Sequence, residues 1–203
     1  MRNRLCHSRN AIPGWSLGLL GAVFGWGLAL LLIGTALAAE GQAALENKVK
    51  AAFLYNFGAH TEWPVGAFAG PDAPLVIGLV GGVPFASELE HGLHGKTLSG
   101  RKIAVRAIGP SDEAGQCHLL FIGTAEPERV VALLAAVAEK PVLTVSDSEG
   151  FVQRGGILNL IKVEGSVKFE ANPAAAARAQ LKLSSQLLKL ARVSKDVRPA
   201  GKD

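Results

Sequence analysis

The sequence predicts an α/β fold in which a mostly parallel sheet is flanked by helices on both faces, with an antiparallel hairpin at one edge. First, short apolar runs alternate with segments of helical periodicity, which is typical of parallel strands joined by helices. Second, Leu75–Val80 is apolar throughout, as expected of a strand that is covered on both faces. Third, two strand-like runs, Ile157–Val163 and Ser166–Ala171, are separated by Glu164-Gly165, which indicates a hairpin.

Prolines and capping residues set the predicted element boundaries. Pro64 ends the first helix, because the residue before a proline is pushed out of the α region. Asn172 and Pro173 suit the N-cap and the first turn of a long final helix. The predicted helices are Ala43–Glu62, Pro84–Leu93, Glu126–Lys140 and Asn172–Val193. The remaining predicted strands are Arg101–Ile108, Cys117–Ile122 and Val142–Val145.

The first 38 residues are predicted to be a secretion signal. Three arginines open the chain, and an uncharged, largely apolar stretch then closes on Ala36-Leu37-Ala38, the small-x-small pattern of a cleavage site. An uncleaved anchor is the alternative, since the stretch is long enough to span a bilayer. In both cases a single α/β domain over residues 39–193, followed by a flexible charged tail over 194–203, is expected in the periplasm.

Charge and cysteine content narrow the function classes. The chain has 21 Lys and Arg against 17 Asp and Glu, and three of the arginines lie in the signal, which leaves 18 against 17. A nearly neutral mature chain gives no reason to expect a nucleic-acid partner. The signal also removes Cys6, so that Cys117 has no partner for an intramolecular disulfide. Cys117 opens an apolar run, which favours burial, with an intermolecular bond as the alternative.

No residue pattern predicts catalysis, a metal or a cofactor. Cys117 and His118 are adjacent on a predicted strand, so their side chains should point to opposite faces. His91 and His94 are three residues apart, but no further ligand completes a metal set at usable spacing. The glycine turn after Leu75–Val80 does not fit the G-x-G-x-x-G dinucleotide motif. We therefore do not expect an enzyme.

A ligand site, if the chain has one, is expected where the parallel strands end. In open α/β sheets ligands bind at the carboxyl ends of the strands. The candidate residues there are Gly82, Phe85, Ser146 and Asp147. Ser146 and Asp147 also suit an ordinary turn, so a structural role is the alternative. Asn159 lies inside an apolar run and is expected to join a structural hydrogen-bond network.

The predicted final helix carries basic residues beside its apolar face. These residues are Arg178, Lys182, Lys189 and Arg192. A solvated helix face explains them. The alternative is a basic surface that meets an acidic partner or lipid headgroups.

An ordered series of segments extends over nearly the whole mature chain, from about Lys48 to Val193. The segments are Lys50–Phe57, Glu62-Trp63-Pro64, Leu75–Gly78, Pro84-Phe85, Cys117–Ile122, Val142–Asp147, Gly150-Phe151, Gly155–Leu160, Val167–Asn172 and Leu183–Leu188. In this order they resemble the YfiR/HmsC family of periplasmic regulators. The resemblance implies a protein that restrains an inner-membrane diguanylate cyclase by contacting its periplasmic part, so that release raises cyclic-di-GMP and favours biofilm. Family members with this role rely on disulfides, and the unpartnered Cys117 departs from that pattern.

Two functions from different classes are therefore expected. The first is a non-enzymatic periplasmic sensor or repressor that contacts the periplasmic part of an inner-membrane signalling protein, as a monomer or as a homodimer. The alternative is a periplasmic small-ligand binding protein whose pocket lies at the carboxyl ends of the parallel strands.

Overall fold

The structure, a computed structural model, describes residues 41–81, 83–109, 111–124 and 126–193. The predicted secretion signal and charged tail lie outside these residues. From Ala44 onward, the described residues belong to one compact unit.

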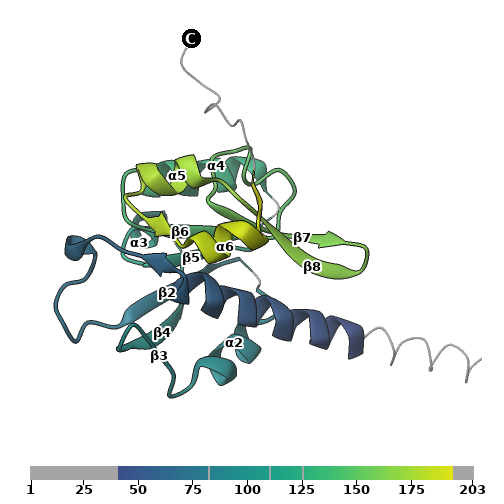
Figure 1. Cartoon of the computed structure of the whole chain (residues 1–203), viewed down its shortest axis with the longest axis horizontal. Coiled ribbons are helices and arrows are strands. Elements are labelled where there is room, and N and C mark those ends of the chain that lie inside the picture. The colour runs from purple at the N-terminus through teal and green to yellow at the C-terminus, as the bar shows by residue number, and fades with distance from the viewer. Residues whose placement is uncertain (1–40, 82, 110, 125, 194–203) are drawn as a thin grey trace, which may run out of the picture. The chain divides into compact units, whose positions relative to one another are not determined.

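The described residues form a curled main sheet of eight strands in the order β10-β8-β7-β6-β5-β2-β4-β3 (Figure 1). Five strands, β4, β2, β5, β6 and β7, pair in parallel, and β10 pairs in parallel with β8. The pairs β7–β8 and β3–β4 are antiparallel. The bounds are β2 (Leu75–Val80), β3 (Thr97–Leu98), β4 (Arg101–Ala107), β5 (Leu119–Ile122), β6 (Leu143–Ser146), β7 (Leu158–Val163), β8 (Ser166–Ala171) and β10 (Arg192–Val193). The predicted α/β sheet with its antiparallel hairpin is confirmed.

Helices cover both faces of this sheet. Alternate residues of a strand point to opposite faces, so each buried strand contributes side chains to the apolar cluster on either side. In β2, Ile77 and Leu79 join a large apolar cluster that includes the helix over residues 41–59, here called the N-terminal helix. Val76 and Val80 join a second cluster with α4. The remaining helical bounds are η1 (Val65–Ala67), α2 (Ala86–Leu93), α3 (Ser111–Ala114), α4 (Pro127–Val137), α5 (Pro173–Arg178) and α6 (Ser185–Leu190).

Aromatic side chains attach the N-terminal helix to the β7–β8 hairpin, which extends alongside it in Figure 1. The rings of Phe57 and Phe169 meet edge to face with centroids 5.0 Å apart, and Phe53 lies 5.7 Å from Phe169. Edge-to-face pairs add stabilisation beyond the area they bury. The hairpin is therefore part of the domain core at its base.

The N-terminal helix ends earlier than predicted, at residue 59 instead of Glu62. The hydroxyl of Thr61 donates to the carbonyl oxygen of Phe57 at 2.7 Å. Thr61 and Glu62 then form β1 (Thr61–Glu62), which pairs antiparallel with β9 (Lys182–Leu183) in a separate two-stranded sheet. The long-range pairing of β1 with β9 therefore replaces the last predicted turn of the helix.

The predicted single helix over Asn172–Val193 is wrong, because the structure divides this segment into α5, β9, α6 and β10. Its start is confirmed, since Asn172 Oδ1 accepts the Ala175 N–H at 2.9 Å. Gln180 adopts a left-handed φ of 58°, which ends α5. Ser184 then caps α6 by accepting the Leu187 N–H at 3.2 Å.

Among the helices of the described residues, none is both long and apolar enough to cross a membrane.

Candidate functional site

Three of the four residues predicted to form a ligand site, Phe85, Ser146 and Asp147, are described by the structure, and they have different surroundings. Phe85 is buried, and its ring meets Phe121 edge to face with centroids 4.9 Å apart. Ser146 is fully buried, and its hydroxyl donates to the Ile122 carbonyl at 2.6 Å. It also accepts the Ser148 N–H at 3.1 Å, which is ordinary turn chemistry. Gly82 lies outside the described residues. Asp147 is exposed and takes part in a different site.

That different site is a charged cluster between the N-terminal helix and the ends of β6 and β7. Lys50 Nζ lies 2.8 Å from Asp147 Oδ2 and 3.3 Å from Glu46 Oε1, and Lys162 Nζ lies 2.8 Å from Glu46 Oε2. These four side chains line a cavity of about 100 Å³. No local sequence pattern predicts the cluster, because Asp147 and Lys162 lie about a hundred residues after Glu46 and Lys50 in the chain.

The charges in this cluster shift one another's pKa. The hydrogen bond from Lys162 holds the pKa of Glu46 below its usual value, although burial acts the other way. Burial alone would lower the pKa of Lys50, but its hydrogen bonds to Asp147 and Glu46 raise it overall. Since each charge has an opposite partner, the arrangement attaches the N-terminal helix to the sheet.

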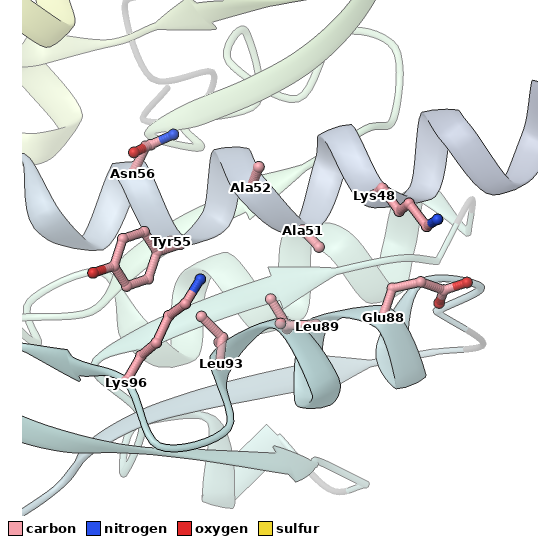
Figure 2. Close-up of a pocket in the computed structure, with 10 residues that line it drawn as sticks. Lys48, Ala51, Ala52, Tyr55, Asn56, Glu88, Leu89, Leu93 and Lys96 are labelled. Carbon is pink, nitrogen blue, oxygen red and sulfur yellow. The ribbon is translucent and has the colours of Figure 1, made fainter.

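A larger groove of about 260 Å³ lies between the N-terminal helix and α2 (Figure 2). Its base is apolar and includes Ala51, Leu89 and Leu93. Small residues facing across the two helices leave this space unfilled. The sequence did show apolar helical periodicity here, but it did not show that α2 packs beside the N-terminal helix.

Charged side chains lie at both ends of this groove. Figure 2 shows Lys96 beside Tyr55 at one end and Lys48 near Glu88 at the other. Lys96 Nζ lies 5.2 Å from the centroid of the Tyr55 ring, within cation–π range. Within the described part of the chain, neither lysine forms an ion pair. The groove therefore offers two ammonium groups and an apolar base to a ligand or partner.

The four basic residues assigned to one helix face lie on different elements. Arg178 ends α5, Lys182 is on β9, Lys189 is on α6 and Arg192 is on β10, and all four are exposed. The strand register places Lys182 opposite Glu62 and Arg192 beside Glu170. The broken helix removes the reason for expecting a continuous basic face, although each side chain is accessible.

The sequence profile described as YfiR/HmsC-like matches residues 47–192. The chain belongs to the YfiR/HmsC-like family. This is a family of periplasmic regulators that act on a partner.

Structural likeness is weaker than this family match. A crystal structure of a conserved domain protein from Vibrio cholerae is 13% identical, with a TM-score of 0.45, over 60% of this chain and 55% of that one. The chain thus spans about half the length of that protein. A comparison with curated proteins finds no match.

Cys117 and His118 have different surroundings. Cys117 is buried in the second apolar cluster, as predicted, and burial raises the pKa of its thiol to about 11. β5 begins at Leu119, two residues later than predicted, so Cys117 and His118 precede the strand; the ring of His118 stacks on Phe68 with centroids 4.2 Å apart. The two side chains therefore do not form a nucleophile–base pair.

The other polar residues singled out in the sequence are His91, His94 and Asn159. His91 and His94 are exposed at the end of α2, and the described residues hold no group of three or more His, Cys, Asp or Glu that could bind a metal. Asn159 is buried, and its Oδ1 has no hydrogen-bond partner among the described residues.

Proposed function

We propose that this chain is exported to the periplasm and restrains an inner-membrane diguanylate cyclase by binding the cyclase's periplasmic part. The observation that carries the proposal is the YfiR/HmsC-like match over residues 47–192, which covers nearly all of the described structure. The apolar run before Ala38 supports export. Restraint by contact requires an accessible surface on the folded domain.

The groove between the N-terminal helix and α2 is the contact surface that we propose. Lys48 and Lys96 bring two positive charges to its ends, against the one carboxylate of Glu88. Its base of Ala51, Leu89 and Leu93 is apolar. Such a surface is complementary to an acidic segment that also carries an apolar side chain. We therefore assign the groove to an acidic segment of the cyclase's periplasmic part.

Gene deletion followed by measurement of cyclic-di-GMP tests the function. We expect the nucleotide to rise in the deletion strain and to return to its original level when the wild-type gene is restored. Mass spectrometry of the periplasmic fraction should find a mature chain that begins at Ala39. Unchanged cyclic-di-GMP, with no membrane protein recovered by crosslinking, would overturn the proposal.

Charge reversal tests the contact surface separately. Lys48→Glu and Lys96→Glu should each weaken restraint, because they place like charges opposite the acidic segment. Lys102→Glu is the matched control, since Lys102 is an exposed lysine on β4 that does not line the groove. Reversal of Arg178, Lys182, Lys189 and Arg192 tests the basic surface predicted from the sequence. If only these four variants weaken restraint of the cyclase, the contact lies on their surface and not in the groove.

A further inference from the structure

A second cavity, of about 240 Å³, lies between α4 and α5. Alanines line it from both helices and from the residues that directly follow them: Ala135 on α4 with Ala138 after its end, and Ala175 on α5 with Ala179 after its end. Their methyl groups are too small to fill the space between the helices. Ile157, from the segment before β7, also lines the cavity and keeps its surroundings apolar.

Two arginines are the charged residues of this cavity. Arg154 and Arg178 line it, and no Asp or Glu is among the described lining residues. Arg154 Nη2 donates to the Glu149 carbonyl at 2.6 Å, whereas its Nε is buried and has no hydrogen-bond partner among the described residues. Arg178 ends α5 and is exposed. Positive charge at this cavity is thus not balanced by its own lining.

The rim of the cavity also exposes apolar surface. Val131 on α4 lines it, and 53% of this residue is exposed. The cavity is slightly smaller than the roughly 300–1,000 Å³ typical of sites for drug-sized ligands. A planar guanidinium matches a carboxylate through two parallel hydrogen bonds. The volume, the largely apolar lining and the two arginines together favour a small ligand with one anionic end.

We propose that the cavity between α4 and α5 binds a small monocarboxylate with an apolar body, its carboxylate held by Arg178 and Arg154. The apolar body lies against the alanines of the two helices. This site is separate from the groove assigned to the partner, and the proposal stands whether or not the chain restrains a cyclase.

Binding of defined probes to the purified mature chain tests the proposal. Sodium phenylacetate and sodium hexanoate are the carboxylate probes, and phenylacetamide and hexanamide are their uncharged counterparts. We expect the carboxylates to give saturable heat in titration calorimetry and to raise the unfolding temperature, because a ligand of the folded state stabilises it. The amides at equal concentration should bind at least about tenfold more weakly, since they lack the charge.

Two variants and a control locate the binding. Arg178→Gln should weaken carboxylate binding about tenfold or more. Ala135→Leu should abolish it by filling the cavity. Ala132→Leu adds the same side chain at an exposed position of α4 that does not line the cavity, and it should bind as the wild type does. Failure of both carboxylates to bind, or equal binding by wild type and Arg178→Gln, would overturn the proposal.

Discussion

The ring of His118 accepts a hydrogen bond from the backbone N–H of Val76, with 3.0 Å between Nδ1 and N. Its other nitrogen, Nε2, lies 3.2 Å from the Ala67 carbonyl oxygen. Because Nδ1 accepts, the hydrogen must be on Nε2, which donates to Ala67. The neutral ring therefore makes both bonds, and burial, with Arg101 acting in the same direction, lowers the pKa of His118.

The first prediction is that acid destabilises the protein through His118. The unfolded chain takes up a proton near the ordinary histidine pKa of about 6.5, whereas the folded chain resists until the pH reaches its lower folded pKa. The contribution of His118 to the free energy of unfolding should therefore be fully present above pH 6.5. It should decrease as the pH falls from 6.5 toward the folded pKa. Urea unfolding at several pH values between 8 and 5 measures how the free energy of unfolding depends on pH.

His118→Phe is the matched variant for this prediction. Phenylalanine can keep the stack on Phe68, but it leaves the Val76 N–H without its acceptor. We expect a loss of about 1–3 kcal/mol at pH 8, the cost of a buried unpaired donor. The pH dependence between 6.5 and 5 should also become shallower. An unchanged slope in His118→Phe would show that another group is responsible.

The second prediction concerns the ion pair between Lys50 and Asp147. A double-mutant cycle with Lys50→Met and Asp147→Asn should give a favourable coupling of about 0.5–1 kcal/mol, since the pair is only partly exposed. The coupling should decrease in 1 M salt. A control cycle that pairs Asp147→Asn with Lys102→Met should give none. A zero coupling for Lys50 and Asp147 would mean that this bridge does not stabilise the N-terminal helix on the sheet.

Local sequence patterns were sufficient for the longer strands, but they did not predict the two-residue strands β1, β3, β9 and β10 or the division of the C-terminal segment. β2 and β8 have the predicted bounds, because a continuous apolar run and a hairpin signal are both local. The segment after Asn172 is rich in Ala and Leu, which favours one helix. Pairing of β9 with β1 overrides that propensity, and it joins residues more than a hundred positions apart.

The candidate sites were hidden for a related reason. Phe85 and Ser146 follow strands and looked accessible, but packing on Phe121 and turn hydrogen bonds place them in the core. The two helix-lined cavities depend on which helices become neighbours. Periodicity identifies the apolar side of a helix, and it does not identify the element against which that side packs.

The third prediction concerns the thiol of Cys117. Only 4% of the residue is exposed, and its pKa is raised to about 11, so little reactive thiolate is present at pH 8. A disulfide reagent such as Ellman's reagent should label the native chain slowly, and labelling should become fast once urea unfolds it. Cys117→Ala supplies the blank. Rapid labelling of the native chain, or a disulfide-linked dimer in non-reducing electrophoresis, would contradict the buried position.

The fourth prediction concerns the close approach of Gly78 to Cys117. A Cβ at position 78 would overlap Cys117 Sγ and lie 2.8 Å from Ile108 Cγ1, in the middle of the buried β2. Gly78→Ala should therefore destabilise the fold by about 1–3 kcal/mol through overpacking. Cys117→Ala removes the sulfur atom, so the double variant should recover part of that loss, although contact with Ile108 remains.

Gly92→Ala is the control for this fourth prediction. Gly92 lies within α2, and a Cβ there would meet nothing within 4 Å. Alanine should stabilise that helix by up to about 1 kcal/mol, because glycine loses more backbone freedom on folding. Urea unfolding of the single and double variants gives both values. If Gly78→Ala is as harmless as Gly92→Ala, or if Cys117→Ala gives no recovery, the sulfur of Cys117 does not lie against β2 as the structure shows.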